Sequence, residues 1–217
     1  LAGEADKAEV LSVVDLIFSE LRYTLEGVFL LRDLSRHVLD QILSTGERLS
    51  SLIIASHLEH ARLIDSREVI KTDDNFGNAN VDYETTAMLI RKSLDQDDRR
   101  VIMAGFIAST ANDETTTLGR GGSDYTAAIV AAALNAEALE IWTDTDGFMT
   151  ADPKKVEKAY AIECLSYQEA IELSHFGAKV IYTPTLRPVY RQQIPVFVRN
   201  SFIAIESRIT PKVFLSI

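Results

Sequence analysis

Hydrophobic residues recur at helical spacing in the N-terminal part of the chain. Between residues 7 and 31 they fall every three or four positions, at Val10, Val14, Ile17, Phe18, Leu21 and Leu25. This spacing predicts an amphipathic helix, which Gly27 would end or kink. The same pattern predicts helices over residues 34–43 and 47–59, with residues 44–46 forming a short turn between them.

Farther along the chain, short apolar runs predict buried strands. They are residues 61–65 (ARLID), 100–107 (RVIMAGFI), 139–143 (LEIWT) and 195–199 (PVFVR). The polar segment 66–81 is predicted to be an excursion or a lid, and Asp82 to cap a helix that runs to Leu94.

Helical patterns also follow the later strands. Ser166 and Glu169 have the spacing of a capping box, before a helix to about Phe176, and residues 185–193 have a helical pattern. Strands therefore alternate with helices, which predicts an α/β fold with a central, mainly parallel sheet covered on both faces, as in a three-layer sandwich. Such sheets bind ligands beyond the carboxyl ends of their strands.

Composition narrows the classes of function. The 217 residues are 47% hydrophobic and 25% charged, which is typical of a globular protein. The net charge of -10 argues against nucleic acid or an anionic membrane as a main partner. The one cysteine, Cys164, cannot form an internal disulfide and fits a cytoplasmic protein. No apolar run approaches the roughly 20 residues that a membrane span needs. Because the chain begins at Leu1, we expect it to be part of a longer protein.

The segment 115–126, TTTLGRGGSDYT, carries the strongest candidate chemistry. Its three glycines would let backbone amides approach an anion, and the helix predicted after it would add unpaired N–H groups. Arg120 offers a planar fork suited to carboxylate or phosphate, and Ser123 or Asp124 would cap the helix. The alternative is a glycine-rich turn with a capped helix and no ligand, which is the better interpretation of a glycine loop alone. The arginine and the acid within this loop strengthen the case for a ligand site.

Other candidates are weaker when each is taken alone. Asp124 would stay ionised near basic groups and could orient lysines or a metal. Thr143 and Asp144 follow a predicted strand and could bind the sugar or base of a nucleotide, or form a simple turn. Lys154 and Lys179 could reach a phosphate, although most lysines are only solvated.

Two further positions have competing interpretations. Glu47 could bind a substrate ammonium, or its negative charge could simply interact favourably with the dipole at the start of a predicted helix. His57 and His60 are three residues apart, but no third ligand stands near them in the sequence, so no metal site made by the protein alone is predicted.

Five phrases of the chain match a known family. They are STGERLS (44–50), TTTLGRGGSDYTAA (115–128), EIWTDTDGFMTADP (140–153), SYQEAIELSHFGAKV (166–180) and IPVFVRN (194–200). On these phrases the chain resembles the catalytic domain of aspartate kinases, members of the amino-acid kinase family, some of which also carry a homoserine dehydrogenase. The resemblance implies the amino-acid kinase, or carbamate kinase-like, fold. It also implies transfer of the ATP γ-phosphoryl group to the β-carboxylate of L-aspartate, the first step of lysine, threonine and methionine biosynthesis.

The resemblance assigns roles to individual residues. Glu47 would hold the substrate ammonium and Arg120 its α-carboxylate, with Phe106 and Ser123 nearby. Asp124 would organise the catalytic lysines. Contacts with ATP, which Mg²⁺ accompanies in phosphoryl transfer, would come from Thr143, Asp144, Met149, Lys154, Lys179 and Val180.

The chain also departs from the family pattern. A KFGGTS-like phrase with a catalytic lysine is absent, so we expect this chain alone to be inactive. Met149 replaces a common tyrosine, and Lys154 a common arginine. Residues 1–205 are predicted to be the kinase domain, and residues 206–217 a linker or the start of a regulatory ACT domain. We expect a homo-oligomer, formed through ACT domains outside this chain.

Two alternatives to an aspartate kinase stay open at this point. One is another member of the amino-acid kinase family, such as a glutamate or uridylate kinase. The other is a non-catalytic module that binds nucleotide, which the missing lysine phrase favours.

Overall fold

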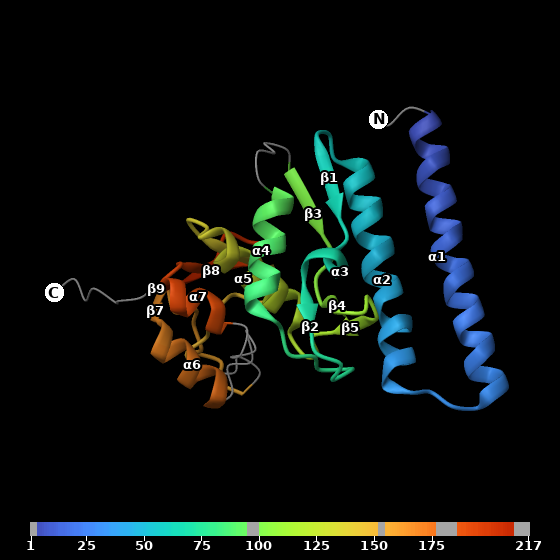
Figure 1. Cartoon of the computed structure of the whole chain (residues 1–217). Coiled ribbons are helices and arrows are strands. Elements are labelled where there is room, and N and C mark those ends of the chain that lie inside the picture. Colours follow the sequence, from blue (N-terminus) through green and yellow to red (C-terminus); the bar gives the residue numbers. More distant parts are fainter. Residues whose placement is uncertain (1–3, 95–99, 152–154, 177–185, 211–217) are drawn as a thin grey trace. The chain divides into compact units, whose positions relative to one another are not determined.

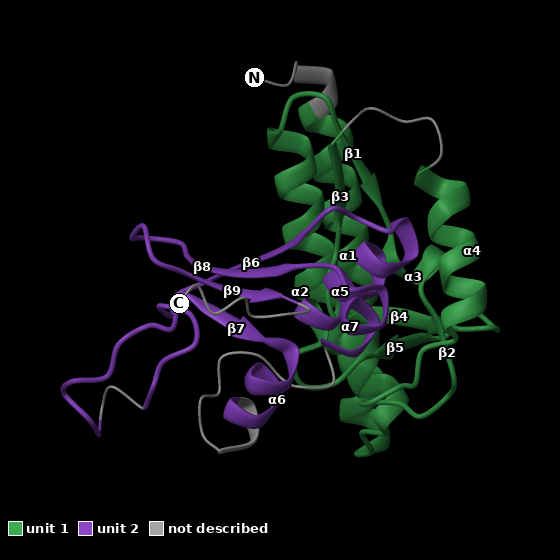
Figure 2. Ribbon diagram, turned by 90° about the vertical axis from the view of Figure 1, so that its left-hand side faces the viewer, with its two compact units in different colours: residues 1–123 green, residues 124–217 purple. Residues whose placement is uncertain are grey.

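The computed structural model describes residues 4–94, 100–151, 155–176 and 186–210 (Figure 1). The chain divides into two compact units, residues 1–123 and residues 124–217 (Figure 2). Each unit has its own strands and helices, and each is described by itself below. None of the helices in the described ranges is both long and apolar enough to cross a membrane.

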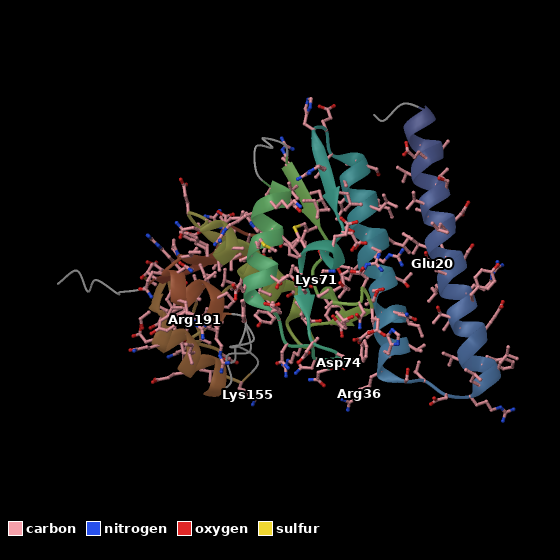
Figure 3. The ribbon with its side chains drawn as sticks, viewed as in Figure 1. Glu20, Arg36, Lys71, Asp74, Lys155 and Arg191 are labelled. Carbon is pink, nitrogen blue, oxygen red and sulfur yellow. The ribbon has the colours of Figure 1, made fainter. Side chains whose placement is uncertain are left out.

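Unit 1 begins with a helical hairpin, in which α1 (Glu4–Leu31) lies beside α2 (Arg36–His57) (Figure 1). Glu20 extends from α1 (Figure 3) and binds the Arg48 guanidinium of α2 at 2.8 Å. The predicted turn at residues 44–46 is wrong, because α2 runs through it without a break. The Ser44 and Thr45 hydroxyls donate to the Gln41 carbonyl within the helix, at 2.7 and 3.4 Å, so they do not end it.

The strands of unit 1 form two small sheets. β1 (Ala61–Ile64) pairs in parallel with β3 (Arg100–Met103). β2 (Lys71–Thr72) pairs in parallel with β4 (Ile107–Thr110), which pairs antiparallel with β5 (Thr115–Thr117). The single strand predicted over residues 100–107 is therefore two strands. The break between them includes Gly105 and Phe106.

The backbone of Phe106 explains this break, because its φ is 70°. A residue with φ near 70° is in the left-handed region and cannot continue an extended strand. β3 therefore ends before Phe106, and β4 begins after it.

Two short helices of unit 1 have aspartates at their start. Asp65 caps α3 (Ser66–Val69) by accepting from the Arg67 N–H at 3.0 Å. The predicted cap of α4 (Tyr83–Leu94) is confirmed, because Asp82 Oδ1 accepts from the N–H groups of Glu84 and Thr85, both at 3.2 Å. These caps satisfy donors that a helix leaves unpaired at its first turn.

The polar segment 66–81, predicted to be an excursion or a lid, is held to unit 1 by hydrogen bonds. The Lys71 ammonium (Figure 3) donates to Ser109 Oγ at 2.9 Å and to Asp113 Oδ1 at 2.7 Å. The Asp73 carboxylate accepts from the backbone N–H of Asn80 at 2.8 Å, which closes the loop that follows β2. The segment therefore supplies α3, β2 and a loop held by hydrogen bonds.

Unit 2 contains one sheet with the strand order β6-β8-β9-β7. Its strands are β6 (Leu139–Thr143), β7 (Cys164–Ser166), β8 (Val196–Asn200) and β9 (Glu206–Thr210). β9 pairs antiparallel with β8 and parallel with β7. Residues 206–210, which the sequence placed in a linker or a regulatory domain, therefore belong to this sheet, and residues 211–217 lie outside the described residues.

In the described part of unit 2, three helices accompany this sheet: α5 (Gly122–Leu134), α6 (Tyr167–Phe176) and α7 (Arg187–Gln192). The predicted capping box of α6 is confirmed, since Ser166 N–H donates to Glu169 Oε2 at 2.7 Å and Glu169 N–H donates to Ser166 Oγ at 3.2 Å. The core joins all three helices to the sheet and includes Ala128, Ala131, Leu139, Ile141, Phe148, Leu165, Tyr167, Ala170, Leu186, Val189, Val196, Val198 and Ile209.

The predicted α/β class is confirmed. Among the described strands, the pairs β1–β3, β2–β4, β6–β8 and β7–β9 are parallel, and β4–β5 and β8–β9 are antiparallel. Parallel pairs need crossover connections, which here are largely helical.

Candidate functional site

The glycine-rich loop joins β5 to α5, as the sequence predicted. Gly119 and Gly121 have φ values of 71° and 68°, a conformation that glycine adopts without steric cost. At Gly119 space is also restricted, because an added Cβ would lie 2.5 Å from Asn78 Oδ1. The loop thus needs glycine both for its backbone conformation and for close packing.

Phe106 and Ser123, two predicted neighbours of the substrate, are brought together around this loop. A Cβ added at Gly122 would lie 2.7 Å from Phe106 Cδ2, and one added at Gly105 would lie 2.8 Å from Ser123 Cβ. The Phe106 carbonyl also accepts from the N–H of Leu118 at 2.9 Å. The break between β3 and β4 is therefore packed directly against the loop that carries Arg120.

Asp40 is a functional candidate that the sequence reasoning missed. It lies on α2 and its residue is fully buried. Its carboxylate accepts from the N–H groups of Gly77 and Thr117, at 2.8 and 2.9 Å, and from the Thr117 hydroxyl at 2.8 Å. The signal in the sequence was a polar series at helical spacing, Asp40, Ser44, Glu47 and Ser51, which the predicted turn at 44–46 concealed.

Glu47 is half-buried in the middle of α2. Its distance from the start of the helix rules out the alternative in which it only favours the helix dipole, because that effect is confined to the first turn. Glu47 follows Asp40 by seven residues, so the two side chains share one face of α2, about 10.5 Å apart along its axis. Arg120 lies in the exposed part of the glycine-rich loop.

Asp124 lies in the first turn of α5, and it differs from the expectation in its electrostatics. The sequence reasoning expected nearby basic groups to keep this acid ionised. Burial instead raises the pKa of the Asp124 carboxyl above its ordinary value. A cation bound beside Asp124 would therefore favour the ionised form of its carboxyl group.

The strand-end candidates of unit 2 lie in a turn after β6. Thr143 is the last residue of β6, and its hydroxyl donates to Asp144 Oδ1 at 3.3 Å. Gly147 has a φ of 90°, and an added Cβ would lie 2.4 Å from the Ser207 hydroxyl. This turn is consequently packed onto β9, with Asp144 exposed.

The remaining ATP candidates are only partly described. Met149 is half-buried and forms an isolated bridge with Ala161. Lys154, Lys179 and Val180 lie outside the described residues.

Comparison with known proteins decides the family. Residues 4–200 match the sequence profile of the amino acid kinase family. The chain belongs to the amino acid kinase family. The resemblance drawn from the sequence is thereby confirmed.

Curated relatives of this amino acid kinase chain are named as aspartokinases. It is 40% identical over 204 residues to lysine-sensitive aspartokinase 3 of Escherichia coli (strain K12), covering 89% of this chain and 45% of the relative. It is 36% identical over 198 residues to a bifunctional aspartokinase/homoserine dehydrogenase of Buchnera aphidicola, covering 89% of this chain and 24% of the relative. The chain thus spans less than half the length of these two relatives.

Solved structures agree on the fold of this amino acid kinase chain. The structure of E. coli aspartokinase III in complex with aspartate and ADP matches with a TM-score of 0.82 at 34% identity, over 99% of this chain and 54% of that one. A uridylate kinase from Archaeoglobus fulgidus matches with a TM-score of 0.53 at 21% identity, over 88% of this chain and 80% of that one, and shows the shared fold alone.

Proposed function

We propose that the protein containing this chain is an aspartate kinase, which transfers the ATP γ-phosphoryl group to the β-carboxylate of L-aspartate and yields 4-phospho-L-aspartate. The observation that carries the proposal is the link between α2 and the glycine-rich loop through Asp40. One of these elements bears Glu47 and the other bears Arg120. An amino-acid substrate presents an ammonium and an α-carboxylate, and these need partners of opposite charge.

In this proposal each residue near the loop has a defined role. Glu47 binds the substrate ammonium, and the Arg120 guanidinium binds the α-carboxylate through paired hydrogen bonds. Phe106 and Ser123 lie against the loop and would line the same site. Asp124 would orient catalytic lysines, whose positive charge would offset the cost of burying its carboxylate.

The nucleotide would be held by residues of unit 2. Thr143, Asp144 and Met149 would contact ATP, together with Lys154, Lys179 and Val180. Mg²⁺ would neutralise negative charge on the phosphates, as it does in phosphoryl transfer generally. The fit for Mg²⁺ rests on Asp124 and Asp144, since one or two carboxylates and the phosphates themselves commonly hold this ion.

An ADP-release assay on the complete gene product tests the substrate. Aspartate should support ADP release, while glutamate and uridylate should not. Release with glutamate or uridylate and none with aspartate would replace the proposal by one of these kinases. Calorimetry then tests the non-catalytic alternative, because binding of ATP without any turnover would favour it.

Assembly and location form a further part of the proposal. We expect a homo-oligomeric, cytoplasmic enzyme with regulatory ACT domains beyond this chain, acting in lysine and threonine biosynthesis under allosteric control. The curated relatives are longer than this chain, which leaves room for such domains. Mass photometry of the complete gene product measures its oligomeric state, and a monomer at all concentrations would reject the assembly.

A further inference from the structure

The buried face of α2 is unusual in being polar. Its fully or almost fully buried residues are Asp40, Ser44, Thr45 and Ser51. The apolar residues of the same helix are at most half-buried, such as Ile42, Leu49 and Leu52, or exposed, such as Leu43 at 45% and Ile53 at 56%. Hydrophobic packing alone therefore does not explain how this face of α2 is joined to the rest of unit 1.

Asp40 supplies a specific link from this face. A buried carboxylate is costly unless hydrogen bonds replace its lost water, and Asp40 accepts three from outside its own helix. Two come from the N–H and hydroxyl of Thr117, at 2.9 and 2.8 Å, and one from the Gly77 N–H at 2.8 Å. Bonds to a charged acceptor are stronger and more directional than neutral ones.

Thr117 is held completely by this arrangement. Its N–H and hydroxyl bind Asp40, and its carbonyl accepts from the Ala79 N–H at 2.9 Å. It is also the last residue of β5, three residues before Arg120. Fixing Thr117 on Asp40 therefore fixes the start of the glycine-rich loop relative to α2, and hence relative to Glu47 two turns farther along.

We propose that Asp40 is a positioning residue for substrate binding. By holding Thr117, it sets the spacing between Glu47 and Arg120, so that the two charges engage the ammonium and the α-carboxylate of one amino-acid molecule. Asp40 itself does not touch the substrate. This inference rests on the proposed function, because it takes Glu47 and Arg120 as the groups that bind aspartate.

The test separates positioning from a purely structural role. In the complete gene product, Asp40→Asn keeps the shape of the side chain but replaces the carboxylate by a neutral amide. Its NH₂ group would face the Thr117 hydroxyl, so that this hydrogen bond would have to reverse, and the bonds from the two N–H groups would go to a neutral acceptor. We expect the KM for aspartate to rise roughly 10- to 100-fold, in line with the cost of misplacing groups by about 1 Å. The KM for ATP should change less than about twofold, since the nucleotide candidates lie in unit 2. A merely structural role would lower the active fraction and leave both KM values unchanged.

Matched variants make the comparison specific. Thr117→Val removes only the hydroxyl bond to Asp40 and should raise the KM for aspartate by a smaller factor, which keeps the inference testable if Asp40→Asn does not fold. Thr117→Ser retains the hydroxyl and should behave as the wild type. Ser44→Ala is the control on the same buried face, because among the described residues its hydroxyl bonds only to the Gln41 carbonyl, within α2.

The outcomes are distinguishable from those for the proposed function. Wild-type protein without aspartate-dependent ADP release would overturn the function and this inference together. Active wild type, combined with Asp40→Asn and Thr117→Val variants whose KM for aspartate is unchanged, would overturn the inference alone. Equal rises in the KM for aspartate and for ATP would also overturn it.

Discussion

Replacing Gly119 by alanine tests the shape of the glycine-rich loop directly. Gly119 has a φ of 71°, and an alanine Cβ there would lie 2.5 Å from Asn78 Oδ1 and 3.2 Å from the Gly77 carbonyl oxygen. The left-handed conformation costs an L-residue about 1–2 kcal/mol. Moving the flexible Asn78 amide and the backbone of Gly77 adds strain, so we expect a total loss of about 2–3 kcal/mol in the free energy of unfolding.

Urea unfolding followed by circular dichroism measures this loss. Gly77→Ala is the matched control, because Gly77 has a φ of 86° but an added Cβ would meet nothing within 4 Å. It should lose only the backbone contribution, about 1 kcal/mol. The double variant Asn78→Ala/Gly119→Ala removes the clash with the amide and should recover part of the difference.

The reasoning would be refuted if Gly119→Ala cost no more than Gly77→Ala. That result would mean that the loop does not pack against Asn78 as the structure shows. A neutral Gly119→Ala variant would go further and contradict the left-handed backbone itself. Steady-state kinetics of the Gly119→Ala variant provide a second test. Displacing the glycine-rich loop moves Arg120, so the KM for aspartate should rise.

Three further predictions concern the site and its helix. Arg120→Ala should raise the KM for aspartate far more than that for ATP, and equal effects in steady-state kinetics would contradict its role. Gly46→Ala should stabilise α2 by about 0.5–1 kcal/mol in urea unfolding, because an added Cβ meets nothing within 4 Å. Gly27→Ala, the matched variant within α1, should stabilise the protein by the same amount. Of these two variants, only Gly46→Ala, which is next to Glu47, should raise the KM for aspartate. Asp124→Asn should abolish turnover while increasing stability at neutral pH. Burial raises the pKa of the Asp124 carboxyl above its ordinary value of 3.8, so the folded state holds this proton more tightly than the unfolded state, and wild-type stability falls as the pH rises above that ordinary value. The advantage of Asp124→Asn in unfolding experiments should therefore widen as the pH rises above about 4, and a constant difference would contradict the raised pKa.

Local signals in the sequence predicted a large part of the fold. The cap at Asp82 and the capping box of Ser166 and Glu169 were both correct, because their partners lie within three residues. The strand, loop and helix around Arg120 were also correct. In each case the information lies in a few adjacent residues, where glycine conformation and capping geometry decide the structure.

The predictions were wrong where the same local residues can form their hydrogen bonds or pack in two different backbone conformations. Ser44 and Thr45 beside a glycine resemble a turn, yet their hydroxyls are equally satisfied by the Gln41 carbonyl inside a helix. Phe106 sits within an apolar run that reads as one strand, but its positive φ divides it in two. Tertiary packing determines the backbone conformation in both places, and the local sequence pattern does not predict it.

Asp40 could not have been identified from its neighbours in sequence. Its partner Thr117 is 77 residues away, and the Gly77 N–H belongs to the segment predicted to be an excursion or a lid. A helical polar series suggests a buried hydrogen-bonding face, but it does not say which strand meets it. The raised pKa of Asp124 could not be predicted from the sequence either, because burial depends on packing that the sequence alone does not specify.

The division of the chain into two units predicts which kinetic constant of the proposed kinase each substitution should change. The amino-acid candidates Glu47, Phe106, Arg120 and Ser123 all belong to unit 1, and the nucleotide candidates all belong to unit 2. The boundary falls after Ser123, within α5. Substitutions of these four unit 1 candidates should therefore act mainly on the KM for aspartate. Asp124, the first residue of unit 2 and part of the same helix, should instead act on the rate of transfer, because its proposed partners are the catalytic lysines and not the amino acid.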